Sequence, residues 1–243
     1  MRLIGSGDLT ILRPMNPETL DHVAFWVADR DPIADFVTSK LGMHVVDRTD
    51  DFTLVGSDAR RGKLTLFAAD GPREPGPLLH VALRVTDLNA AVDGFAVERP
   101  RDGEAYFDVS EGLRLGLVEA PTEVEYDLDH VALASGNPAD TAAEYETLGF
   151  TGAEPGPSGA PRVEVGGAFV EFHAGEASEP DKPLLNHLAV LVESAQEHID
   201  EAEERGLEVD RVVDAANTYA AFIWGPERVL IEYVEHKPGF ALT

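Results

Sequence analysis

Short apolar runs that contain a histidine recur four times along the chain. They read LDHVAF, LHVAL, LDHVAL and LNHLAV, and they begin at Leu20, Leu79, Leu128 and Leu185. Runs of this length and composition predict β-strands with at least one buried face. Their starts are about 59, 49 and 57 residues apart. A spacing of this size indicates an internal repeat, and therefore a fold built from four similar modules.

Each histidine-containing run is followed by a segment with helical start and stop signals. The clearest case is the fourth, where Ser194 and Glu197 form a capping box and Gly206 ends the helix. Behind each helix come two or three strand-like runs separated by turn signals such as Gly225-Pro226. The predicted helices cover approximately residues 29–41, 88–95, 137–149 and 194–206.

The pattern therefore predicts four βαβββ modules in an α+β fold. One module cannot cover its own apolar sheet face, so we expect modules to pair, two per domain, into curved mixed sheets with helices outside. The polar stretch at residues 119–127 is the expected boundary, and it gives domains of residues 1–121 and 122–243. The segments 71–77 and 175–183 are then joints between modules within a domain.

Composition narrows the choice of partners. The 45 acidic and 19 basic residues give a net charge of -26, which disfavours nucleic acid and anionic membranes as partners. The absence of cysteine excludes disulfides, thiolate nucleophiles and zinc fingers. No signal peptide and no apolar run of membrane-spanning length stand out. We expect a cytoplasmic protein that binds a small molecule, with homo-oligomer formation left open.

Two carboxylates occupy positions in the middle of predicted strands. They are Glu171 in the third module and Glu232 in the fourth. A carboxylate there costs several kcal/mol if it is desolvated and unpaired, so it needs a cation, a hydrogen-bond network or a wet pocket. The first two modules have Leu66 and Gly116 at the corresponding positions. We therefore expect the second half of the chain to carry the site.

The candidate metal ligands are His130, His187 and Glu232, with Glu171 or His173 nearby. Two imidazoles and one carboxylate around a cation with open positions suit Fe(II) and oxygen chemistry. With a second carboxylate the set suits a Lewis-acid metal such as Ni, Zn, Co or Mn. The spacing of the residues leaves both sets open.

At these residues the sequence resembles the vicinal oxygen chelate superfamily, which includes glyoxalase I, type I extradiol ring-cleaving dioxygenases and bleomycin-resistance proteins. The resemblance extends from about Pro17 to Glu235 and implies two glyoxalase-like domains. Similarity to the dioxygenases implies the ligands His130, His187 and Glu232, with His173 as acid-base residue. It further implies Fe(II) or Mn(II), and a small aromatic diol that reacts with O2.

The chain departs from the dioxygenase pattern at a substrate-orienting position. The family has a tyrosine ten residues before the ligand glutamate, where this chain has Phe222. Tyr219 is the candidate that could supply the phenol instead. Because of this departure, two other classes of the superfamily remain as alternatives to a dioxygenase.

A glyoxalase-like metal-dependent isomerase or lyase is the first alternative. Resemblance to it implies four ligands, His130, Glu171, His187 and Glu232, around Ni(II), Zn(II) or Co(II). The second alternative is a non-enzymatic protein that sequesters a ligand, as bleomycin-resistance proteins do. No dinucleotide or phosphate-binding fingerprint is present. The preferred prediction is a metal-dependent oxidoreductase of the dioxygenase type.

Overall fold

The computed structural model describes residues 15–57, 62–176 and 178–238. The amino-terminal segment, in which we expect no signal peptide, lies outside these residues. In chain order the elements are β1 (Thr19–Val27), α1 (Arg30–Lys40), β2 (His44–Arg48), β3 (Phe52–Gly56), β4 (Lys63–Ala68), β5 (Leu78–Val85), α2 (Leu88–Ala91), β6 (Glu104–Ser110), β7 (Leu113–Glu119), β8 (Asp127–Ser135), α3 (Pro138–Thr147), β9 (Thr151–Ala153), β10 (Arg162–Val165), β11 (Ala168–Ala174), β12 (Leu185–Leu191), α4 (Ala195–Arg205), β13 (Val209–Asp214), β14 (Thr218–Trp224), the 3-10 helix η1 (Pro226–Arg228) and β15 (Leu230–His236).

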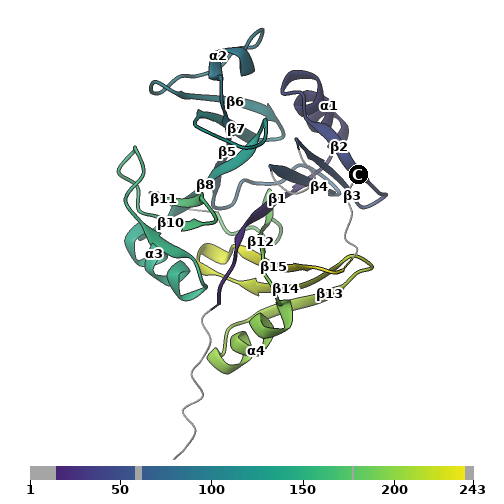
Figure 1. Ribbon diagram of the computed structural model, residues 1–243, viewed down its shortest axis with the longest axis vertical. Coiled ribbons are helices and arrows are strands. Elements are labelled where there is room, and N and C mark those ends of the chain that lie inside the picture. Colours follow the sequence, from purple (N-terminus) through teal and green to yellow (C-terminus); the bar gives the residue numbers. More distant parts are fainter. Residues whose placement is uncertain (1–14, 58–61, 177, 239–243) are drawn as a thin grey trace, which may run out of the picture.

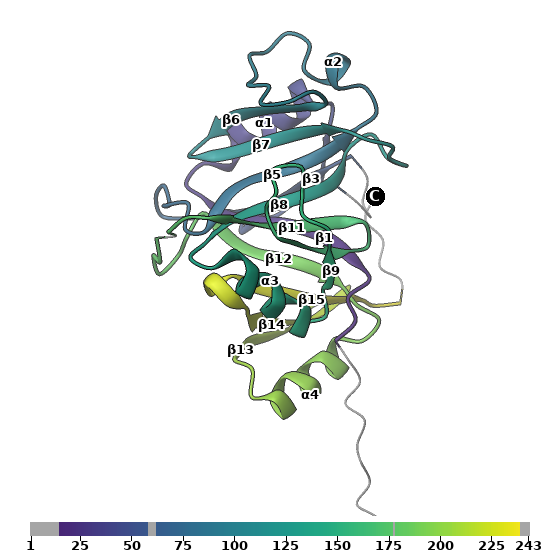
Figure 2. The same cartoon turned by 90° about the vertical axis from the view of Figure 1, so that its left-hand side faces the viewer.

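The predicted α+β fold of four repeated modules is confirmed. Each module opens with a histidine-containing strand, β1, β5, β8 or β12, and continues into a helix and further strands. The strands fill the middle of the molecule, and the helices lie at its periphery (Figures 1 and 2). The second module is reduced, because α2 has one turn and two strands, β6 and β7, follow it.

The helix boundaries follow the capping signals in the sequence. At the start of α4 the Ser194 hydroxyl accepts a hydrogen bond from the Glu197 backbone N–H, and at its end Gly206 adopts a left-handed conformation with φ of 68°. Asp29 caps α1 in a similar way. These local interactions satisfy terminal backbone groups that have no partner within the helix. No helix in the described ranges is both long and apolar enough for a membrane span.

The strands form two sheets, and each sheet combines two modules. Sheet A has the order β13-β14-β15-β12-β1-β4-β3-β2 and joins the first module to the fourth. Sheet B has the order β6-β7-β5-β8-β11-β10-β9 and joins the second module to the third. In the middle of each sheet the two histidine-containing strands pair antiparallel, β1 with β12 and β5 with β8.

This pairing corrects the predicted pairing of neighbouring modules. The proposed halves, 1–121 and 122–243, each contribute one module to sheet A and one to sheet B. The polar stretch at 119–127 connects β7 to β8 inside sheet B instead of separating two domains. The prediction was wrong because proximity along the chain does not decide which apolar strands pair; the register and the cover of the sheet faces do.

Two connections carry the chain between the sheets, and they run side by side. They are the segments 69–77 and 175–184. They include the stretches 71–77 and 175–183, which were predicted to be joints within domains. The Leu184 backbone N–H donates to the Glu74 carbonyl at 2.7 Å. At Gly76, which has φ of +64°, an added Cβ would lie 2.6 Å from Pro183 Cβ. Only a residue without a side chain fits this crossing.

The alternation of side chains along the central strands separates the core from the site. In β1, Val23 and Phe25 are fully buried in the hydrophobic core, whereas His22 and Ala24 point to the opposite face of the sheet. The other three opening strands repeat the pattern of a histidine followed two residues later by alanine. The small alanine leaves space beside each imidazole, so every module contributes a histidine to a cavity face.

Candidate metal centre

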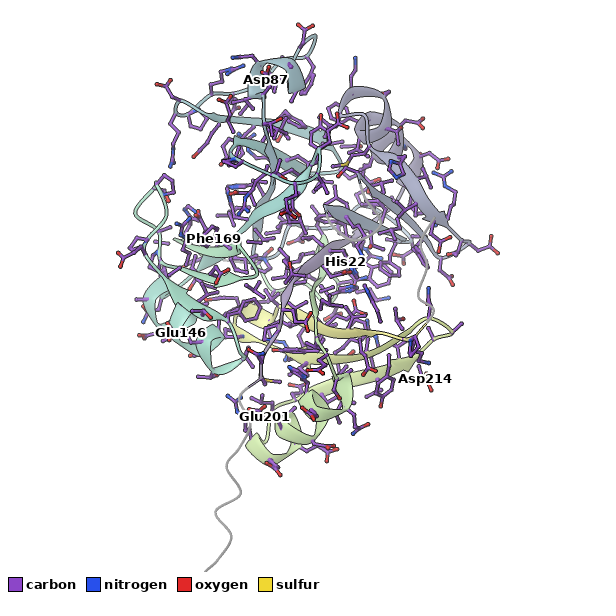
Figure 3. All side chains as sticks on the ribbon, in the orientation of Figure 1. His22, Asp87, Glu146, Phe169, Glu201 and Asp214 are labelled. Atoms are coloured by element: carbon purple, nitrogen blue, oxygen red, sulfur yellow. The ribbon has the colours of Figure 1, made fainter. Side chains whose placement is uncertain are left out.

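Three side chains converge in the middle of sheet A. They are His22 on β1, His187 on β12 and Glu232 on β15. The two histidine Nε2 atoms are 3.1 Å apart. Glu232 Oε2 lies 3.0 Å from Nε2 of His187 and 3.3 Å from Nε2 of His22. Figure 3 labels His22 in this region of the molecule.

The hydrogen bonds of the other ring nitrogens fix the tautomers of both imidazoles. Asp21 accepts from His22 Nδ1 at 2.8 Å and also from Lys63 Nζ at 2.9 Å. Asn186 Oδ1 lies 2.9 Å from His187 Nδ1 and accepts a hydrogen bond from it. With both Nδ1 atoms protonated, neutral imidazoles present only lone pairs at Nε2. Histidine ligands of metals are commonly oriented by such an outer hydrogen bond.

The convergence of three acceptor atoms requires a positive charge between them. Burial opposes ionisation of Glu232, but the neighbouring His187 and His22 hold its pKa well below its usual range. Burial also opposes protonation of His22, but hydrogen bonds and charges from Asp21 and Glu232 raise its pKa to about 9. A proton can therefore occupy this position, and a metal ion can replace it.

The spacing of the three atoms fits one divalent cation. Ligand atoms about 2.1 Å from a shared ion and at right angles to one another lie about 3.0 Å apart. The observed separations of 3.0, 3.1 and 3.3 Å match this spacing. Two imidazoles and one carboxylate on one side of an ion leave its remaining positions open.

The strand register identifies the place where a fourth ligand would stand. Glu232 is paired with Ala189, two residues after His187. By the same rule the counterpart near His22 is Thr65, which is paired with Ala24. The sequence alignment of the modules, which gave Leu66 for this position, was wrong by one residue, because Leu66 is paired with Phe25 and lies in the core. Thr65 is buried and lines the cavity. Sheet A therefore offers a carboxylate from β15 and a neutral hydroxyl from β4.

The three candidate ligands line a cavity of about 400 Å³. Trp26, Phe52, Phe67 and Phe222 contribute aromatic rings to its walls. The rings of Phe67 and Phe222 lie 6.0 and 5.2 Å from the His187 ring. Arg211 also lines the cavity, with its guanidinium carbon 3.9 Å from the centre of the Phe222 ring. The cavity can therefore hold a flat apolar ligand that carries polar or anionic groups at one end.

The structure separates the predicted site residues into two groups. His187 and Glu232 lie together, as predicted, but their third partner is His22. His130 lies on β8 in sheet B, where its Nε2 faces Nε2 of His80 at 3.0 Å. The grouping of His130 with His187 and Glu232 was wrong because β8 and β12 belong to different sheets.

The other predicted residues also lie away from the sheet A cluster. Glu171 and His173 stand on β11 in sheet B, with Glu171 Oε2 3.5 Å from His173 Nε2. The Tyr219 hydroxyl donates a hydrogen bond to Gln196 Oε1 at 3.0 Å in an exposed position. Tyr219 is not among the described residues that line the cavity. Phe222, where the resemblance led us to expect a tyrosine, does line it.

Sequence reasoning missed His22, although a signal was present. His22 follows Asp21, just as His130 follows Asp129 and His187 follows Asn186. In the structure each of these three preceding side chains contacts Nδ1 of its histidine. The polar residue before the histidine thus marks an oriented imidazole, whereas His80 follows Leu79.

The buried ion pair that supports His22 gives a testable effect on stability. Asp21 and Lys63 are almost completely buried and lie 2.9 Å apart. Lys63→Met should lower the free energy of unfolding by about 3–5 kcal/mol, because it removes the buried ammonium group that offsets the buried Asp21 charge. Urea denaturation measures this change. Lys40→Met at an exposed helix end is the control, with an expected change within about 0.5 kcal/mol; equal effects would contradict the assigned role of Lys63.

Comparison with known proteins agrees with the fold and the resemblance. Residues 19–99 match the family model described as the Glyoxalase/Bleomycin resistance protein/Dioxygenase superfamily. The chain has the glyoxalase fold. No curated protein matches the chain at significant sequence similarity. The superfamily resemblance predicted from the four histidine-containing runs is thus confirmed.

Three solved structures illustrate the shared architecture. A Bacillus subtilis protein with a suggested dioxygenase function has a TM-score of 0.75 at 19% identity, over 93% of this chain and 87% of that one. Glyoxalase I from Zea mays has a TM-score of 0.71 at 16% identity, over 89% and 92%. The cppA protein from Streptococcus pneumoniae has a TM-score of 0.62 at 13% identity, over 90% and 99%. At these identities the likeness concerns the glyoxalase-like fold.

Proposed function

We propose that this protein is a metal-dependent oxidoreductase that acts on a small aromatic diol with O2, using Fe(II) or Mn(II). The observation that carries the proposal is the cluster of His22, His187 and Glu232, with three donor atoms 3.0–3.3 Å apart. This set leaves positions open for two substrate oxygens and for O2. When bound there, the metal would lower the pKa of a coordinated hydroxyl and hold the reactants together.

The neutral residue at the fourth position favours this reaction over isomerisation. A glyoxalase-like isomerase or lyase would use a second carboxylate beside the metal as a base. In sheet A the register places Thr65 there. Glu171, the second carboxylate in that alternative, lies in sheet B.

The cavity walls supply the binding and proton-transfer groups. The aromatic rings of Phe67 and Phe222 would hold the face of a flat ring, and Arg211 would attract an anionic substituent. His236 lines the same cavity, with Nε2 3.7 Å from Asp21 Oδ1. Burial lowers the pKa of His236, so its imidazole is neutral at neutral pH and can accept a proton there. This role replaces the one predicted for His173.

The proposed function is tested by metal analysis and oxygen consumption. Protein purified without oxygen and loaded with Fe(II) should consume O2 when given catechols that carry a carboxylate, and should release a coloured ring-opened product. Activity with Ni(II) or Zn(II), without O2 uptake, would favour the glyoxalase-like alternative. Tight binding of an aromatic ligand by metal-free protein, without turnover, would favour sequestration.

The contribution of His236 can be measured in the same assay. His236→Gln should lower kcat about 100-fold, with a smaller change in KM, because general acid-base groups contribute about 10²–10⁴ to the rate. His44→Gln, at an exposed position on β2, is the matched control and should retain full activity. An unchanged kcat in His236→Gln would contradict the acid-base assignment.

A further inference from the structure

Sheet B contains a second pair of facing imidazoles, outside the site described above. His80 on β5 and His130 on β8 have their Nε2 atoms 3.0 Å apart. Their ring centroids are 5.1 Å apart with an interplanar angle of 79°. The corresponding values for His22 and His187 are 5.2 Å and 75°. The two sheets thus present the same arrangement of two histidines.

The strand register adds a carboxylate in the same relative place. Glu171 is paired with Ala132, two residues after His130. Glu232 stands in this relation to His187, since it is paired with Ala189. Glu171 is buried, at 5% exposure. Its backbone is therefore placed to deliver a carboxylate to the His80–His130 pair, as β15 does in sheet A.

The outer contacts of His130 resemble those of His22. Asp129 Oδ1 lies 2.7 Å from His130 Nδ1, and Arg84 Nε donates to the other oxygen of Asp129 at 2.7 Å. The carboxylate accepts a hydrogen bond from Nδ1–H, so a neutral His130 directs the lone pair of Nε2 toward His80. Asp21 and Lys63 do the same for His22 in sheet A. Such support is typical of metal-ligating histidines.

The imidazole pair opens into a cavity of about 350 Å³. His173 lines it on the same strand face as Glu171, and Tyr106 lines it on the opposite side. The Tyr106 ring is 4.7 Å from the His80 ring. It packs over Gly116, where a Cβ would lie 2.6 Å from the ring. The cavity has room for an ion and its remaining water ligands.

One difference from sheet A lies in the present partners of Glu171. Its Oε1 is 3.4 Å from an Arg162 guanidinium nitrogen, and its Oε2 is 3.5 Å from His173 Nε2. Glu232 instead contacts both of its neighbouring imidazoles directly. To reach His80 and His130, the Glu171 carboxylate must leave Arg162.

We propose that sheet B holds a second site for a divalent cation, formed by His80, His130 and Glu171. Its affinity is lower than that of the sheet A site because Arg162 competes for the Glu171 carboxylate. The site does not depend on the reaction proposed for sheet A. Each chain then binds two metal ions of unequal affinity.

Titration with Co²⁺ of the metal-free protein, comprising the whole 243-residue chain, tests this inference. Calorimetry should resolve two binding events, and visible absorption of the bound cobalt should report nitrogen and oxygen ligands in both. His130→Ala should abolish the weaker event and retain the tighter one. His22→Ala should do the reverse. A single event that His130→Ala leaves unchanged would overturn the second site without affecting the first. A tighter event that persists in His22→Ala would count against the sheet A site alone.

Two further variants examine the competition for Glu171. Arg162→Gln should strengthen the weaker event about tenfold, the equivalent of one hydrogen bond to a charged group, because it frees the carboxylate. Arg114→Gln is the matched control: Arg114 lines the same cavity but pairs with Glu98 and Asp108, so the affinity should not change. Glu171→Gln keeps the shape of the side chain and should weaken the same event. Unchanged affinity in both Arg162→Gln and Glu171→Gln would overturn the role of Glu171.

Discussion

Replacement of His22 by alanine is expected to lower the affinity of the sheet A site for a divalent metal by two orders of magnitude or more. His22 supplies one of three ligands, and loss of even an outer partner of a ligand commonly costs about 10–100-fold. The variant also removes the positive charge that would otherwise lie between His187 and Glu232 in the metal-free protein. Calorimetric titration with Co²⁺ or Mn²⁺ measures the change.

His44→Ala is the control that distinguishes loss of a metal ligand from a general effect of removing an imidazole. His44 stands on β2 at an exposed position, so His44→Ala should bind metal like the parent protein. His187→Ala should resemble His22→Ala, because both imidazoles face the same carboxylate oxygen. Parent-like affinity in His22→Ala would show that the first module does not take part in the site.

Separation of the chain at residue 121 is expected to abolish both cooperative folding and tight metal binding. The fragment 1–121 contains β1 and β5, and the fragment 122–243 contains their central partners β12 and β8. Each fragment alone therefore exposes two apolar strand edges that are paired in the whole protein. The fragment 122–243 also retains His187 and Glu232 without His22.

Co-expression of the two fragments is the informative complement to that experiment. The mixed fragments should recover one cooperative urea transition and the tight metal-binding event, since all strand pairs can form again. Circular dichroism and metal titration follow the two properties independently. A fragment 122–243 that folds and binds metal alone with the affinity of the full chain would contradict the pairing of modules described above.

The local elements could be predicted because their causes are local. Strand alternation and capping residues act within a few positions, so the opening strands and the ends of α1, α3 and α4 follow from the sequence. The shortened α2 is a partial exception. Its apolar stripe continues to Phe95, but the regular helix ends at Ala91. There, tertiary packing of Phe95 with Phe36 and Phe107 replaces further helical turns.

The pairing of modules could not be predicted because the modules resemble one another. Each opening strand has the same pattern of histidine and alanine, so each could pair with any other by pattern alone. This ambiguity also affected the site. His187 and Glu232 belong to the same module and were predicted together, but their third partner depends on which strand lies beside β12. Asp21 before His22 marks an oriented imidazole on β1, but Asp129 before His130 marks β8 equally, so this local signal does not decide which of the two strands lies beside β12.

The order of the modules in sheet A affects how the protein is synthesised. The second and third modules can complete sheet B as soon as residue 174 has emerged from the ribosome, whereas β1 has no central partner until β12 has followed. An unpaired apolar edge is prone to association with other chains. Of the four modules, the first is translated before the others but is completed only with the fourth, and the nascent chain would benefit from chaperone protection during that interval.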